Sequence, residues 1–326
     1  MTRTTRLVIF LLGIGLARPG HTQPLPAGSS GIAAKYPGDV GIGADPAVIF
    51  ADDFESYGSG AGLTAKWDSA YHAANIRIAT EAANVHGGSK ALELTVPKQS
   101  SEVSNTALKT VSPGRDVLFL RYYSRYDTGF DVLGSSHNGS TMSSNYCCPG
   151  VPADGYNKFL VSYEAGRETK AVANPGQLNL YIYHPDQRDI WGDHFYPTGV
   201  VYPFSYKPFD FGPDFVSRPD VTPQLGKWYC YELMVKTNTP GKRDGRVALW
   251  LDGKLIADFL NLRLRETTAL KIDQFTIDLH VKSNTLAVAR KWYDDVVAAT
   301  SYIGPKATSP AQPPQLKAPT GLRIVP

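Results

Sequence analysis

The side chains best suited to chemistry in this chain lie in alternating polar rows. Arginine, tyrosine, lysine and histidine recur at even spacing in four short segments, which are Arg121/Tyr123/Arg125, Lys158/Ser162, Asn179/Tyr181/Tyr183 and Asp278/His280/Lys282. Residues two apart in a β-strand point to the same face of a sheet, so each row presents its polar groups together. Arginine forks and tyrosine rings suit the hydroxyl and carboxylate groups of sugars. We expect the rows to line one carbohydrate-binding groove, unless they form only the solvated face of an antiparallel sheet.

Histidines are the second source of chemistry. His280 lies on a polar strand face between Asp278 and Lys282, where an imidazole can act as a base or donate to a carboxylate. A surface histidine without a catalytic role is the alternative interpretation. His184 and His194 lie among aspartates, but their spacing matches no known metal-binding pattern.

Several enzyme classes lack their signatures here. Glycoside hydrolysis needs a pair of carboxylates on opposite sides of the bond, and the Glu-x-Asp-x-x-Glu strand motif for such a pair is missing. Glu164 and Glu232 are the strand-borne glutamates to consider, and they lie in separate segments. The sequence also lacks a Gly-x-Ser-x-Gly elbow and a phosphate-binding loop, which argues against serine hydrolases and kinases.

The elements that must position these residues are strands. In the segment 274–282, Phe275, Ile277, Leu279 and Val281 alternate with polar residues, which is typical of a half-buried strand. The Asp252-Gly253 pair suits a tight hairpin, and no long segment has a helical stripe. We predict an all-β antiparallel sandwich with little helix, folded as one domain of about 260 residues over 46–304.

The two ends of the sequence are different in character. Residues 1–23 combine basic residues with an apolar run from Leu7 to Leu16, which predicts a secretory signal peptide and a secreted or periplasmic protein. We expect a flexible linker at 24–45 and a Pro-rich tail at 305–326. No later run is long enough to span a membrane. The formal net charge of +3 is spread along the chain, which argues against nucleic-acid binding. We also expect a monomer.

Cysteines and clustered acids suggest two structural features. We expect Cys230 to form a disulfide with Cys147 or Cys148, because a bridge between the two adjacent cysteines would strain their peptide bond. Carboxylates before the first strand and on the last strand can hold a structural Ca²⁺, or they can simply solvate the strand ends. The proposed ligands are Asp53, Glu55 and Asp295. We expect no cofactor for catalysis.

Several adjacent stretches resemble a known family, the jelly-roll polysaccharide lyases of the alginate and glucuronan lyase type in the concanavalin A-like superfamily. They are residues 121–127, 226–233, 238–241, 244–245, the Trp-x-Asp-Gly hairpin at 250–253, and 292–296. The resemblance implies a jelly-roll fold and β-elimination on a uronate-containing, anionic polysaccharide. Lys158 matches a lysine of that family, whereas the loop 134–154 with its paired cysteines has no counterpart.

Such an elimination needs a cation to offset the uronate carboxylate, a base for the neighbouring proton, and an acid for the departing oxygen. We assign the cation to Lys158 with Arg121 or Arg125, and the acid and base to Tyr181 or Tyr183, with His280 as the competing base. The remaining residues of the polar rows are assigned to substrate binding: Arg121, Tyr123, Arg125, Asn179 and Lys282. The alternative function is a non-catalytic, lectin-like carbohydrate-binding sandwich.

Overall fold

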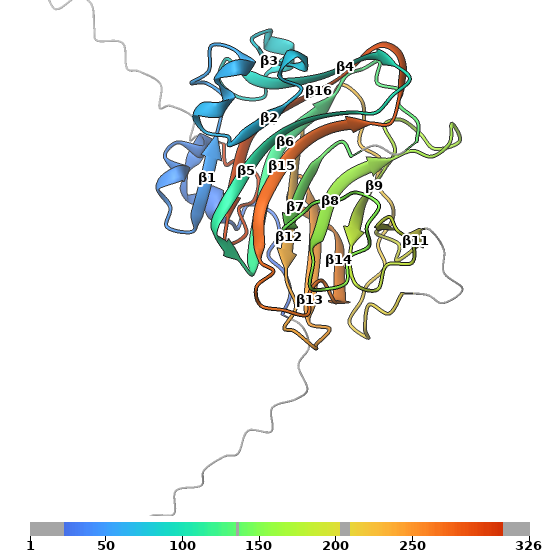
Figure 1. The fold of residues 1–326 in the computed structure, drawn as a ribbon. Helices are drawn as coiled ribbons and strands as arrows, with labels where there is room; N and C mark the ends of the chain where they lie inside the picture. Colours follow the sequence, from blue (N-terminus) through green and yellow to red (C-terminus); the bar gives the residue numbers. More distant parts are fainter. Residues whose placement is uncertain (1–22, 135–136, 203–208, 309–326) are drawn as a thin grey trace, which may run out of the picture.

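The computed structural model describes residues 23–134, 137–202 and 209–308 of the chain (Figure 1). These residues form two curved antiparallel β-sheets of eight strands each, one lying over the other. We call them the front sheet and the back sheet. The predicted antiparallel sandwich with little helix is confirmed, because the described helices are all short 3-10 turns.

The back sheet carries the following strands in spatial order: β14 (Lys254–Leu262), β13 (Gly245–Leu251), β12 (Tyr229–Lys236), β6 (Val117–Tyr126), β16 (Asn284–Ala299), β4 (Ala91–Gln99) and β3 (Ile76–Ala79). A further strand, β1 (Val48–Asp52), pairs with the end of β16.

The front sheet carries these strands in spatial order: β11 (Val201–Tyr202), β10 (Asp193–Phe195), β9 (Gln177–Tyr183), β8 (Phe159–Gly166), β7 (Ser140–Ser144), β15 (Ile272–Val281), β5 (Val103–Arg115) and β2 (Ser69–Tyr71). Six 3-10 turns complete the described part of the chain: η1 (Ile32–Lys35), η2 (Pro37–Asp39), η3 (Ile42–Ala44), η4 (Gly60–Ala65), η5 (Ala73–Asn75) and η6 (Ala82–Asn84).

The core lies between the two sheets and follows from the period-two pattern. Ile277 and Leu279 of β15 point inward from the front sheet, and Leu120 and Tyr122 of β6 point inward from the back sheet. All four are almost completely buried. Burying one large apolar side chain stabilises a fold by about 1.5–3 kcal/mol, so this shared interior holds the sheets together.

The segment 24–45 is not a flexible linker, so that prediction is wrong. It packs across the outer face of the back sheet, where Ile32 and Ile42 join a second apolar cluster with Trp250 and Tyr302. The amide of Ile32 donates to the carbonyl of Tyr302 at 3.0 Å. The cause is an apolar outer face on β12 and β13, which is stabilised when these isoleucines cover it.

The predicted disulfide is also wrong. Cys230 is buried on β12 of the back sheet, whereas Cys147 and Cys148 are exposed in the loop after β7 of the front sheet, and all three are free thiols. Packed sheets lie about 10 Å apart, and a disulfide needs Cα atoms within about 7 Å of each other. The bond would therefore have to cross the core.

The ends of the chain are only partly described. The predicted signal peptide lies almost wholly outside the described residues, as does most of the Pro-rich tail. Within the tail, the backbone amide of Lys306 donates to the Tyr123 hydroxyl at 2.9 Å, so its first residues pack against the back sheet. No helix in the described ranges is long and apolar enough to cross a membrane.

Candidate functional site

The outer face of the front sheet carries a continuous polar surface. On β8, Val161 and Tyr163 point into the core, so Ser162 and Glu164 point outward. The pairing of β8 with β9 places Ser162 beside Tyr181 and Glu164 beside Asn179. Rows predicted from separate segments are therefore neighbours in space.

Two histidines converge on the carboxylate of Glu164, which is buried on this surface. The Nδ1 atom of His137, in the loop before β7, lies 2.6 Å from Glu164 Oε2. The Nδ1 atom of His194, on β10, lies 3.5 Å from Glu164 Oε1 and 2.9 Å from Asn179 Oδ1. Both Nδ1 atoms face oxygens that can only accept, so each carries the proton and leaves Nε2 for other partners.

Tyr181 lies between these two histidines. Its ring centroid is 4.7 Å from that of His137 and 4.8 Å from that of His194. Its hydroxyl oxygen accepts a hydrogen bond from the Gly192 amide at 3.0 Å, and the hydroxyl also interacts with that of Tyr183. A Cβ atom at Gly192 would lie 2.6 Å from the Ile182 carbonyl oxygen, which explains why glycine is needed at this close approach.

The local charges push the histidines toward different protonation states. Burial opposes the charged form of His137, but the Glu164 carboxylate outweighs burial and raises the His137 pKa above its ordinary value. Burial lowers the pKa of His194 despite the same carboxylate. Burial and the neighbouring His137 charge lower the pKa of His280 to about 4. Paired groups with separated pKa values are the usual arrangement for acid and base roles.

The row predicted at Asp278, His280 and Lys282 reaches the same surface from β15. The ring of His280 lies 5.1 Å from that of His137, and the His280 amide donates to the His137 carbonyl at 2.8 Å. Asp278 is buried and accepts from Thr141 at 3.2 Å, and burial raises its pKa to about 6. Lys282 is exposed just beyond the end of β15.

Lys158 and Tyr183 lie on the same face but hold the cysteine loop. The Lys158 ammonium donates to the carbonyls of Cys147 at 2.6 Å and Cys148 at 2.8 Å. It also lies 4.8 Å from the Tyr183 ring centroid. The Tyr183 hydroxyl accepts from the Gly150 amide at 3.4 Å. Both side chains are almost completely buried, so their contacts are structural in this arrangement.

The row on β6 lies elsewhere, and the expectation of one shared groove is wrong for it. The strand β6 belongs to the back sheet because it pairs with β12 and β16. Its residues Arg121, Tyr123 and Arg125 point outward from that sheet. Arg121 is buried in an ion pair of 2.6 Å with Asp39, and Tyr123 stacks on His86 at a centroid distance of 3.7 Å. The core separates these residues from the histidine site.

Three residues of the site were not predicted: His137, Glu164 and His194. Extending the Lys158/Ser162 row by one further alternation would have found Glu164. His194 was considered only as a metal ligand, and Glu164 only for hydrolysis. His137 lies in an irregular loop, where no spacing rule indicates the direction of a side chain.

A buried polar network holds the loop that contains His137 from the core side. The ammonium of Lys291, on β16, donates to the carbonyl of Asn138, and the Tyr126 hydroxyl donates to Asn138 Oδ1 at 2.6 Å. Asn138 in turn pairs with the backbone of Ala165 on β8. Burial lowers the pKa of Lys291, although Asp278 partly offsets that effect. These bonds hold His137 in place beside Glu164.

The acids suggested as calcium ligands do not form one oxygen cage. Asp295 accepts from His86 Nδ1 at 2.8 Å and from the Lys306 ammonium at 2.7 Å. Glu55 accepts from the amides and hydroxyl of residues 89–90, and the exposed Asp53 accepts from the Glu55 amide. Asp294 and Asp295 come close to His86, but Lys306 already supplies a positive charge there. Calcium sites use about 6–8 oxygen ligands, so these residues fit calcium poorly, and the metal stays a prediction.

No family model and no curated protein matches the chain. Among solved structures, an alginate lyase variant in complex with an alginate trisaccharide aligns with a TM-score of 0.57 and 19% identity, over 78% of this chain and 98% of that one. An alginate lyase from a Chlorella virus aligns with a TM-score of 0.52 and 15% identity, over 78% and 100%. The glucuronan lyase of the fungus Trichoderma reesei aligns with a TM-score of 0.50 and 16% identity, over 78% and 96%. The chain therefore has the jelly-roll fold that these polysaccharide lyases share, as its sequence stretches predicted.

Proposed function

We propose that the protein is a polysaccharide lyase that cleaves a uronate-containing chain by β-elimination on the outer face of the front sheet, outside the cytoplasm. The observation that carries this proposal is the placement of Tyr181 between His137 and His194, with His137 hydrogen-bonded to Glu164 and His194 to Asn179. The arrangement offers a cation, a base and an acid within one small area. The shared fold with alginate and glucuronan lyases supports the same reaction class.

His137 offsets the charge of the substrate. Its raised pKa favours the protonated ring, and Glu164 occupies Nδ1, so the Nε2–H group can donate to the uronate carboxylate. A fixed cation at this position stabilises the negative charge that develops when the adjacent proton is removed. This role replaces the one first assigned to Lys158, whose ammonium is bonded to two loop carbonyls.

His194 and Tyr181 move the protons. Neutral His194 takes the proton from the carbon that bears the carboxylate, through Nε2, and the released electron pair forms a carbon–carbon double bond. The bond from the neighbouring carbon to the glycosidic oxygen then breaks, and the Tyr181 hydroxyl protonates the departing oxygen. The Tyr181 hydroxyl is protonated at neutral pH, as a general acid requires. Burial raises its pKa further, which opposes the tyrosinate, so the nearby His137 charge must stabilise the anion that forms when the proton leaves.

The test measures the unsaturated product, which has a new ultraviolet absorbance. We expect absorbance to rise on at least one polymer from a panel of alginate, glucuronan, pectate and glycosaminoglycans. Tyr181→Phe should lower turnover by about 10²–10⁴-fold with polymer binding retained. Tyr183→Phe, on the same strand face, is the matched control, because it removes the neighbouring hydroxyl but leaves the proposed acid in place, and it should keep most activity. Binding without any cleavage by the wild type would instead establish the lectin-like alternative.

A further inference from the structure

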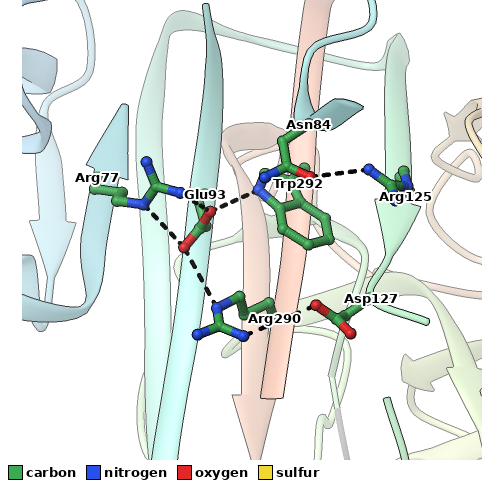
Figure 2. Close-up of a pocket in the computed structure, with 7 residues that line it drawn as sticks. All are labelled: Arg77, Asn84, Glu93, Arg125, Asp127, Arg290 and Trp292. Carbon is green, nitrogen blue, oxygen red and sulfur yellow. Dashed lines mark hydrogen bonds and ion pairs between the residues drawn. The ribbon is translucent and has the colours of Figure 1, made fainter. Parts of the chain in front are cut away.

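A cavity of about 330 Å³ lies on the outer face of the back sheet, on the side away from the histidine site. Figure 2 shows its lining side chains, which come from β3, η6, β4, β6, β16 and the residue after β6. They are Arg77, Asn84, Glu93, Arg125, Asp127, Arg290 and Trp292. Ligand pockets in proteins have volumes of about 300–1,000 Å³, so this cavity can hold one small polar unit.

Part of this lining is internally paired. The buried carboxylate of Glu93 accepts from Arg77 Nη2 at 2.6 Å and from the Trp292 indole nitrogen at 2.7 Å (Figure 2). Arg77 also pairs with the exposed Glu81 at 3.0 Å, so its guanidinium is already engaged by two carboxylates. The indole group of Trp292 is fixed at the same point.

Two guanidinium groups remain without full compensation. Arg125 donates to the carbonyl of Gly226 and to Asn84 Oδ1, and no carboxylate lies within 4.0 Å of it among the described residues. Arg290 lies 3.7 Å from Glu93 and 3.9 Å from Asp127, beyond hydrogen-bond distance of both carboxylates. Its side chain is 40% exposed, so its donors can reach a ligand.

The donors of Arg290 therefore favour an anion. Arg77 pairs with both Glu93 and Glu81, so its charge is already compensated. Within the described residues, the Arg290 guanidinium lies beyond hydrogen-bond distance of Glu93 and Asp127. Guanidinium forks match the geometry of carboxylates in a way that ammonium groups do not. Asp127 and Asn84 add acceptors for hydroxyl groups, which a simple inorganic anion does not have.

We propose that this cavity is an accessory binding site for one uronate unit of an oligosaccharide, with Arg290 as the main contact to the carboxylate. The choice of a uronate rests on the proposed function, whereas the presence of an anionic sugar site rests on the cavity itself. None of the lining residues is a histidine or a tyrosine, so the site holds a chain without cleaving it. It would keep polymer on the protein while the front sheet acts on another part of the chain.

The test follows two indole signals in nuclear magnetic resonance spectra of the full chain in its Tyr181→Phe form. Trp292 reports on the cavity, and Trp191, which precedes the Gly192 contact to Tyr181, reports on the front sheet. The probes are a mannuronate trisaccharide, neutral cellotriose and sodium sulfate. We expect the uronate trisaccharide to shift the Trp292 signal, and Arg290→Ala to weaken that response at least tenfold. Lys98→Ala, which removes one exposed positive charge at the far end of β4, is the matched control and should leave it unchanged.

The outcomes separate this proposal from the lyase proposal. A Trp292 signal that does not move with the uronate, or that moves equally in Arg290→Ala, would overturn the accessory site. Sulfate that saturates the shift at the same concentration as the trisaccharide would overturn the sugar assignment. A Trp292 response that depends on Arg290, together with a wild-type protein that releases no unsaturated product from any polymer of the panel, would keep the accessory site and reject the lyase.

Discussion

The outer faces of the two sheets carry similar residues, but these residues have different surroundings. Tyr181 and His194 on the front sheet, like Tyr123 and His86 on the back sheet, form close aromatic pairs. Both tyrosines are nearly buried, with Tyr181 7% and Tyr123 8% exposed. On the back sheet, the segment 24–45 and residues 302–306 cover the neighbouring face and engage its polar groups. Residue type and exposure therefore do not distinguish the two pairs, whereas their polar partners do, because His194 lies beside Glu164 and Tyr123 accepts from the Lys306 amide.

Replacing one residue on each face should give the largest difference in the rate of product formation. His194→Gln should lower the rate of product formation by about 10²–10⁴-fold, because it removes the base without disturbing the core. Tyr123→Phe should leave that rate unchanged and lower stability by only about 0.5–1.5 kcal/mol, through loss of the hydroxyl bond to the Lys306 amide. Initial rates and urea denaturation of both variants test the comparison. A large rate loss in Tyr123→Phe would return the back sheet to the catalytic machinery.

The covered face should be sensitive to the loss of a charge partner. Asp39→Ala leaves the Arg121 guanidinium buried without its carboxylate, which should lower the free energy of unfolding by about 3–5 kcal/mol. Lys271→Ala removes a half-exposed partner of Asp116 and should cost less than about 1 kcal/mol. Urea titrations of the two variants give the difference directly. Equal, small effects would mean that segment 24–45 does not seal this face.

The histidine site on the outer face of the front sheet should respond to pH. His194 must be neutral, so activity should rise as the pH passes its lowered pKa. His137 must be protonated, so activity should fall as the pH passes its raised pKa. Glu164→Gln removes the carboxylate that raises both pKa values, so both limbs of the kcat/KM profile should move to lower pH. The control Glu102→Gln changes an exposed acid near His280 and should shift the profile much less. An unchanged profile in Glu164→Gln would exclude His137 as the cation.

The smallest expected effect concerns the acids at the strand ends. Lys306 already pairs with Asp295, so a chelator should leave the Tm unchanged. Lys306→Met should lower the free energy of unfolding by about 1.5–3 kcal/mol, because it removes a charged hydrogen bond from a nearly buried carboxylate. Thermal melts with and without chelator, for both proteins, make the measurement. A clear drop in the Tm of the wild type with chelator would support the structural calcium.

Part of the front-sheet site could be predicted from alternation. The pattern around Tyr181 and Asn179 correctly separated outward from inward residues on β9, and the same rule identified His280 on β15. Local alternation works here because successive side chains of a strand point to opposite faces, whatever the rest of the chain does. His137 could not be found in this way, since its position depends on bonds from Lys291 and Tyr126 to the neighbouring Asn138.

The sequence by itself determined the strands, their inward and outward faces, the all-β class and the resemblance to a lyase scaffold. Only the tertiary structure decided which sheet each strand joined and which outer face the segment 24–45 covers. The row on β6 shows the reason, because its own residues are compatible with either sheet. Its place is set by pairing with β12 and β16, which are about 100 or more residues away in the chain. Pairing between distant strands depends on the packing of the whole core, and no local pattern encodes it.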